Sequence, residues 1–309
     1  MQTAVRGEDA VLWAEGLTKT WDGIKYQLNG VDLVLTRGER AGLVGANGCG
    51  KSTLLRLLAG KDDADAGSVQ ARRGLVAAYV EQEPEFPPGS SIASVMYAGE
   101  SPVMRTLREY DEATAALQAG EDGAQQRWER AADAMTTQGA WDAENMAARM
   151  IEQLLPQYAA DLNAPCASMS GGERKRVAIA SALLQKPDLL LMDEPTNHLD
   201  VRAIEWLERE LVDKSACLLL VTHDRYFLEA TCNYIYELDG SALYKHQGSY
   251  SQYLTAKAQR ERELAQAIDV AKKQAKKELE WVRRMPSARQ TKSKTRVARY
   301  YALDEFARS

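Results

Sequence analysis

The sequence predicts an α/β domain that carries an all-helical insertion and is followed by a long basic helix. Continuous apolar runs at 189–192 and 217–221 are typical of strands buried on both faces of a parallel sheet. Helical patterns alternate with these runs, as in sheets that are covered by helices. The stretch 91–160 contains mainly Ala, Glu, Gln, Arg and Met, which favours two or three helices. We therefore expect a domain over 1–252, with a helical subdomain at about 91–165, and a basic helical tail over 253–309.

Composition excludes several classes of protein. The 309 residues are 45% hydrophobic and 27% charged, which are the proportions of a globular chain rather than a disordered one. No apolar run reaches the roughly 18 residues that span a bilayer, so we expect neither a channel nor a permease and no membrane insertion. The N-terminal stretch contains Arg6, Glu8 and Asp9 without an apolar centre, which excludes a secretory signal. The four cysteines lack CxxC spacing, which favours reduced thiols in the cytoplasm, with an organelle stroma as the alternative.

The first part of the domain predicts a strand, a glycine-rich loop and a helix in succession. Residues 30–36 alternate in polarity, 37–39 turn the chain, and 41–44 predict a second strand. The loop 45–50 follows, and 51–58 has the pattern of a helix. Residues 76–80 predict a further strand.

The loop fits the pattern G-x-x-x-x-G-K-[ST] over Gly45–Ser52. Its glycines let backbone N–H groups surround phosphates, Lys51 supplies a positive charge, and the Ser52 hydroxyl suits Mg²⁺. The N-terminus of the following helix also attracts phosphate. A plain glycine-rich turn would not require this order of strand, loop and helix. The sequence therefore predicts a phosphate-binding loop.

Polar residues follow two of the apolar strands. Asp193 and Glu194 come after 189–192, at the strand end that faces the nucleotide crevice in such sheets. Asp193 suits Mg²⁺ through water, and Glu194 can polarise an attacking water. His223 follows the second strand and can hydrogen-bond a γ-phosphate while orienting Glu194. The alternatives are a helix-capping or surface pair of acids, and a histidine buried in the core.

A second glycine motif, Ser170–Arg174, precedes a helical run over 175–185. Ser-Gly-Gly at the start of a helix is a second candidate anion site, although the pattern alone is weak evidence. Residues 201–212 predict another helix.

The tail predicts one helix over 253–285, which Pro286 ends. Its apolar positions form a single stripe: Leu264, Ile268, Ala271, Ala275, Leu279 and Val282. Residues 257–309 contain 15 Lys and Arg against 7 Asp and Glu, a net charge of +8, which leaves −13 for residues 1–256. A basic tail on an acidic body favours a polyanionic partner, and a solvated charged helix is the alternative.

Together these motifs resemble the ATP-binding-cassette ATPases, in that family's order. The order is the phosphate loop, Gln82 of the Q-loop, the signature 169–173, the strand 189–194 and the switch histidine His223. The family's D-loop falls on 197–200, and its base-stacking aromatic on Trp21, with Tyr26 as the rival.

The resemblance implies ATP and Mg²⁺ as cofactors, and ATP hydrolysis. It also implies a second cassette as partner, because two cassettes hold two ATPs head to tail between the phosphate loop of one and the signature of the other. The catalytic residues it implies are Glu194, His223 and Gln82. The metal site it implies comprises Ser52, Gln82 and Asp193. The nucleotide-binding residues it implies are Trp21, Gly45, Ala46, Asn47, Gly48, Cys49, Gly50, Lys51, Ser52, Thr53, Ser170, Gly171, Gly172, Glu173 and Asp200.

Three features resemble the ABC-F branch, whose members act on ribosomes and have no membrane domains. They are the run Glu194–Asp200 with its Asn-His pair, the sequence Gln82-Glu83-Pro84, and the basic tail. The tail is similar to the interdomain linker of Uup-type members, and 101–142 is similar to the family's arm insertion. The resemblance implies a ribosome-associated translation factor that contacts RNA through 257–309.

ABC-F members carry two cassettes, whereas this sequence has one phosphate loop and one signature. We therefore expect either a half-length protein or a piece of a longer one. Two other functions stay open: the ATPase subunit of a membrane transporter, and a DNA-repair or structural ATPase of the same superfamily. The Asn-His pair and the tail favour ABC-F over the former, and the modest length of the insertion argues against the latter.

Overall fold

The computed structural model describes residues 9–21, 26–213, 216–239 and 242–283, together with Thr295, Ala298, 300–303 and Glu305. The chain divides into two compact units, 1–250 and 251–309, and each is described by itself. In the part of the chain that the structure describes, no helix is both long enough and apolar enough to cross a bilayer.

The first unit contains a three-stranded antiparallel sheet in the order β2-β1-β4. Its strands are β1 (Ala10–Thr20), β2 (Tyr26–Thr36) and β4 (Ala66–Ala71). The expected strand at 30–36 therefore begins earlier, at Tyr26, because its first residues pair with the end of β1. Apolar side chains of β1 and β2, such as Leu17 and Leu35, are buried on one face.

The second sheet has the order β5-β6-β7-β3-β8-β9 and is parallel except at β9. Its strands are β3 (Arg40–Gly45), β5 (Ala77–Val80), β6 (Leu189–Asp193), β7 (Cys217–Val221), β8 (Tyr234–Asp239) and β9 (Ala242–Gln247). Every residue of β6 and β7 is buried, as their apolar sequences predict. Helix α1 (Lys51–Leu58) contributes Leu54, Leu55 and Leu58 to the core that both sheets share. The helices α7 (Val201–Asp213) and α8 (Arg225–Thr231) follow β6 and β7.

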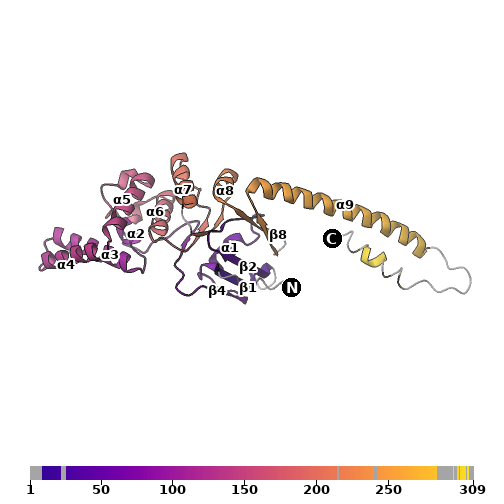
Figure 1. Cartoon of the computed structure of the whole chain (residues 1–309), viewed down its shortest axis with the longest axis horizontal. Coiled ribbons are helices and arrows are strands. Elements are labelled where there is room, and N and C mark those ends of the chain that lie inside the picture. The colour runs from indigo at the N-terminus through magenta and orange to yellow at the C-terminus, as the bar shows by residue number, and fades with distance from the viewer. Residues whose placement is uncertain are drawn as a thin grey trace, which may run out of the picture. The chain divides into compact units, whose positions relative to one another are not determined.

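The segment 91–160 contains four α-helices, one more than the upper limit that its composition suggested. They are α2 (Ile92–Met96), α3 (Pro102–Gln118), α4 (Ala124–Thr137) and α5 (Trp141–Leu154). The short α2 has its own start signal, a capping box between Ser91 and Ser94. Two short 3₁₀ turns (Pro156–Tyr158 and Cys166–Ser168) lead to α6 (Gly171–Leu184). Figure 1 shows α2 to α5 gathered on the far side of α6 from β1, β2 and β4.

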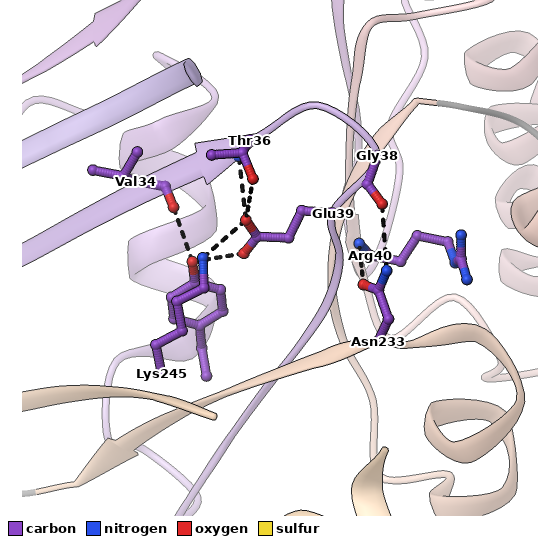
Figure 2. Close-up of polar contacts among 8 residues, drawn as sticks. Val34, Thr36, Gly38, Glu39, Arg40, Asn233 and Lys245 are labelled. Atoms are coloured by element: carbon purple, nitrogen blue, oxygen red, sulfur yellow. Dashed lines mark hydrogen bonds and ion pairs between the residues drawn. The ribbon is translucent and has the colours of Figure 1, made fainter. Parts of the chain in front are cut away.

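A buried carboxylate joins the two sheets. Glu39, at the start of β3, accepts hydrogen bonds from the backbone and hydroxyl of Thr36, at 3.3 and 2.8 Å, on β2. The ammonium of Lys245 on β9 donates to the same carboxylate over 2.9 Å, and the Tyr236 hydroxyl on β8 lies 2.7 Å from it. Figure 2 shows this group beside the Gly38–Asn233 contact. Because an unpaired buried charge is costly, these partners fix β2 against β8 and β9.

The second unit consists mainly of α9 (Tyr250–Arg283). The expected helix covered 253–285, and its expected terminator, Pro286, lies outside the described residues. The apolar stripe is buried at Ala271 and Ala275 but exposed at Leu264. Leu303 lines a groove of about 500 Å³ together with Val270 and Ala271, so Leu303 lies beside part of that stripe.

Candidate nucleotide site

The predicted catalytic residues lie at one edge of the parallel sheet. The phosphate loop follows β3, Gln82 follows β5, Asp193 ends β6 with Glu194 directly after it, and His223 follows β7. These four strands are neighbours in the order β5-β6-β7-β3, and Asp193 pairs with Val221 in register. Because parallel strands end at the same edge, the four predicted positions lie along that edge.

The phosphate loop wraps the N-terminus of α1. Gly50 caps this helix with φ 106°, in the region that favours glycine, and a Cβ there would lie 3.1 Å from the Gln27 carbonyl oxygen. The Lys51 ammonium donates to the carbonyl oxygens of Gly45 and Ala46, each over 3.0 Å. Its side chain therefore folds back along the loop that it would share with a phosphate.

The other loop residues differ in exposure. Ala46, Asn47 and Gly48 are exposed at the tip, whereas Ser52 in the first turn of α1 is half-buried. The Thr53 hydroxyl donates to the side chain of Gln27 over 2.9 Å, so this residue has a protein partner.

The carboxylates at the end of β6 are both buried. Asp193 is 2% exposed, and its Oδ1 has no hydrogen-bond partner among the described residues. A buried carboxylate oxygen without a donor fits a hard cation such as Mg²⁺, which prefers oxygen ligands. The Asp193 carboxylate is therefore compatible with the metal that the sequence predicts.

Glu194 is held from two sides. Its backbone N–H donates to the Val221 carbonyl over 2.8 Å, and its φ of 48° is unusual for a residue with a side chain. His223 Nε2 lies 3.4 Å from Glu194 Oε1, and the His223 backbone N–H donates to Oε2 over 3.4 Å. Burial raises the pKa of Glu194, and the charge and N–H of His223 oppose that rise. A carboxylate that has a raised pKa and is oriented by a histidine at the edge of the sheet suits general-base chemistry.

The signature motif starts α6. Ser170 caps the helix in a capping box with Glu173, whose carboxylate accepts from the Ser170 backbone and hydroxyl over 2.8 Å each. These two bonds lower the pKa of Glu173. A Cβ on Gly172 would lie 3.0 Å from the Cβ of His198, so a larger residue there would require His198 to shift by a few tenths of an ångström. Among the described residues, no hydrogen bond or ion pair joins Ser170–Glu173 to the phosphate loop.

Four other candidates are exposed. Asp200 accepts from the Ala203 backbone N–H over 2.9 Å and so caps the start of α7. Trp21 is 82% exposed and Tyr26 is 52% exposed, at the end of the β1–β2 pair. The side chain of Gln82 is also exposed. Within the described structure, these residues therefore do not touch the carboxylates or Lys51 through any recorded polar contact.

Sequence reasoning missed Lys175 and Arg176, which follow the signature motif. Lys175 is 1% exposed, and its ammonium bonds to backbone carbonyls near the site. Arg176 donates to the Leu154 and His198 carbonyls, over 3.2 Å each. A signal was present for Lys175, because it lies four residues before Ile179 on the buried face of α6.

The four cysteines are free thiols. Cys166, Cys217 and Cys232 are buried, and burial raises the pKa of each, to about 12 for Cys217 and about 11 for Cys232. Cys49 is half-buried in the phosphate loop, and its sulfur would lie 2.8 Å from a Cβ on Gly45.

Comparison with solved structures supports the fold. The structure of an ATP-binding subunit of an ABC transporter covers 77% of this chain and 90% of its own, with a TM-score of 0.57 and 21% identity. A nucleotide-free ATP-binding cassette from an ABC transporter covers 78% of this chain and 92% of its own, with a TM-score of 0.51 and 18% identity. At these identities the likeness shows an ABC ATP-binding cassette fold.

Curated relatives are more similar in sequence. The chain is 41% identical to the uncharacterized ABC transporter ATP-binding protein YfmR of Bacillus subtilis, over 96% of this chain and 47% of the relative. It is 36% identical to the energy-dependent translational throttle protein EttA of Haemophilus influenzae, and 37% identical to EttA of Escherichia coli K12, each over 91% of this chain and 50% of the relative. The chain therefore spans about half the length of the curated relatives that it matches.

Family models agree with these comparisons. A model described as "ABC transporter" matches residues 28–197, and a second with the same description matches 236–309. The first match includes the phosphate loop, the signature and both carboxylates, and it spans more than half of the sequence. This chain therefore belongs to the ABC transporter family of ATP-binding cassettes.

Proposed function

We propose that this chain binds Mg-ATP at the carboxyl edge of its parallel sheet and hydrolyses it in a site completed by a second cassette. The observation that supports this proposal most strongly is the meeting of the phosphate loop, Asp193, Glu194 and His223 at neighbouring strand ends. This combination offers a positive charge, a metal ligand and a base at one edge.

Each residue has a role that follows from its chemistry. Lys51 exchanges its carbonyl partners for the outer phosphates, and the N-terminus of α1 adds backbone donors. Ser52, Asp193 and Gln82 would hold Mg²⁺, which neutralises charge on the phosphates when it is bound. Glu194 accepts a proton from the attacking water, and His223 orients Glu194.

The placement of the signature supports a second cassette as the partner. Ser170 and Gly171 are exposed at the N-terminus of α6, and their recorded bonds stay within that helix and its neighbours. The exposed backbone N–H groups at the N-terminus of a helix can bind a phosphate group. Those of α6 would therefore suit the outer phosphate of an ATP that is bound by another chain or domain. Trp21 or Tyr26 would stack on the base, and Asp200 would lie at the interface between cassettes.

We further propose an ABC-F function, in association with the ribosome. Two curated relatives are named energy-dependent translational throttle proteins, which supports a role in translation. The tail 257–309 has a net charge of +8, whereas residues 1–256 have −13, so RNA phosphates would favour the tail. The Uup-type assignment of this tail rests on sequence resemblance.

The first experiment measures nucleotide affinity by calorimetry in Lys51→Ala. We expect binding to weaken by at least about tenfold, because a charged donor to the phosphates is lost. Lys61→Ala is the matched control, since Lys61 is exposed just beyond the same helix. Equal affinity in Lys51→Ala and the parent would contradict the phosphate-loop assignment.

The second experiment measures co-sedimentation of the chain with ribosomes, with and without ATP. We expect association that depends on nucleotide and weakens with salt. Failure to sediment, together with co-purification of a membrane permease, would instead support the ATPase subunit of a transporter.

A further inference from the structure

We propose that Lys175 is a positioning residue for ATP hydrolysis, which ties the Q-loop and the end of β6 to the first turns of the signature helix α6. This inference rests on the proposed function, because it names a further residue of the same site. Lys175 itself touches neither nucleotide nor water in this role, and it acts through the segments that it holds.

The contacts of Lys175 are unusual for a lysine. It is 1% exposed, although long cationic side chains normally keep their charge in water. Its ammonium donates to the carbonyl oxygens of Glu81 and Asp193, and over 3.3 Å to that of Gln82. An ammonium has three N–H donors, so these three acceptors can satisfy it fully.

These carbonyl groups lie at or just after the ends of two strands. Glu81 and Gln82 follow β5, and Asp193 is the last residue of β6. Beyond the end of β5 the sheet offers the oxygens of Glu81 and Gln82 no further ladder partners, so a donor from outside the sheet can hold them. Lys175 supplies that donor from α6, the helix that Ser170 caps.

The three joined segments carry the groups proposed for catalysis. Gln82 is in the first, Asp193 and Glu194 are in the second, and Ser170 is at the start of the third. The carboxylates that face the ammonium are those of Asp193 and Glu194, from the end of β6, and Glu81, from the segment after β5. A small displacement of a base or a metal ligand is costly in a catalytic site, so removing the tie should lower kcat. The phosphate loop makes no recorded contact with Lys175, so nucleotide affinity should change little.

The test compares Lys175→Met and Lys175→Arg with Lys186→Met, a control at the exposed lysine just after the same helix. In Lys175→Met we expect kcat to fall by roughly tenfold or more while the nucleotide Kd stays within about threefold. Lys175→Arg should recover part of kcat, because a guanidinium also donates hydrogen bonds to carbonyl oxygens but in a planar, bulkier arrangement. A Kd that rises in proportion to the loss of kcat, or a kcat equal to that of the control, would overturn the proposal.

Amide hydrogen exchange provides a second measurement that does not need hydrolysis. In Lys175→Met, exchange at 81–83 and 193–194 should be faster than in the parent, and exchange in α3 and α4 should be unchanged. Should that variant fail to fold, exchange is measured in Lys175→Arg, where it should be faster at the same amides than in the parent, because a planar guanidinium cannot reproduce the three bonds of the ammonium. Unchanged exchange overturns the tie. A parent that hydrolyses no ATP at any protein concentration rejects the proposed function, whatever the exchange shows.

Discussion

At the residue scale, the surroundings of Glu194 favour the role of a general base. It is 6% exposed, has a strained backbone and faces His223. In Glu194→Gln the shape is kept, but the amide cannot accept a proton from water. We expect ATP hydrolysis to fall by roughly a hundredfold or more with nucleotide affinity unchanged or higher. Steady-state hydrolysis and calorimetry measure the two quantities, and hydrolysis at the parental rate would contradict the role of Glu194.

The pH dependence of hydrolysis reports on the same carboxylate. Burial raises the pKa of Glu194 above its ordinary value of 4.5, so activity should fall with acid at a higher pH than an exposed glutamate would give. His223 opposes that rise, and removing it in His223→Gln should move the acid limb to still higher pH. The pH profile of kcat in both proteins tests this. An unmoved limb would show that His223 does not act on the Glu194 charge.

At the scale of an element, the basic residues of the tail allow a prediction about RNA binding. The basic cluster Arg289, Lys292, Lys294 and Arg296 lies outside the described residues, so this prediction uses its charge alone. Replacing all four residues with Ala should make the slope of log K against log salt for RNA shallower by roughly 3. Binding titrations at several salt concentrations measure the slope.

The matched control removes four exposed basic residues of the body: Lys61, Arg73, Arg149 and Lys186. We expect this control to leave the slope unchanged, because the body has a net charge of −13 and should not approach RNA closely. An equal change in both variants would show that the tail has no special part in RNA binding.

Elements with purely local signals were predictable from the sequence. The strands β6 and β7 consist of buried, mostly apolar residues, and the phosphate loop has a fixed pattern. The strands β1 and β4 were not predicted, since β1 is interrupted by polar residues and Gly16, and β4 is largely exposed. Long-range pairing, rather than propensity, makes them strands.

The candidate site also contains residues that the sequence predicts and contacts that it does not. Its motif residues are close to one another in sequence or follow recognisable strands, so their meeting at one edge was predictable. The place of Lys175 on the buried face of α6 left a signal, but its partners were not predictable, because they are backbone carbonyls 94, 93 and 18 residues away, which side-chain identity does not encode. Two helices in the insertion begin at Ser caps, whereas α4 begins after Gly123, and this variety of starts explains why the number of helices was underestimated.

At the scale of the whole molecule, the composite site predicts that specific activity rises with protein concentration. A sharper form of this prediction mixes two inactive variants, Lys51→Ala and Gly171→Asp. A Cβ on Gly171 meets only Arg174, at 4.0 Å, so the aspartate fits and places a negative charge at the signature. In a head-to-tail dimer the mixed pair has one intact site, and mixing equal amounts should restore roughly a quarter of the parental activity. Hydrolysis that is independent of concentration, without recovery on mixing, would contradict the two-cassette arrangement.

The four cysteines should differ in their reactivity toward oxidants. A buried thiol with a pKa of about 11 or 12 stays protonated at neutral pH and is a poor nucleophile toward peroxide. Cys49 is the half-buried exception among the four cysteines, all of which the structure describes. A Cβ built on Gly45 would lie 2.8 Å from its sulfur, so a bulky adduct such as glutathione on Cys49 would crowd the phosphate loop. Oxidative damage to this chain would therefore appear first as a loss of nucleotide binding, while the core stays chemically intact.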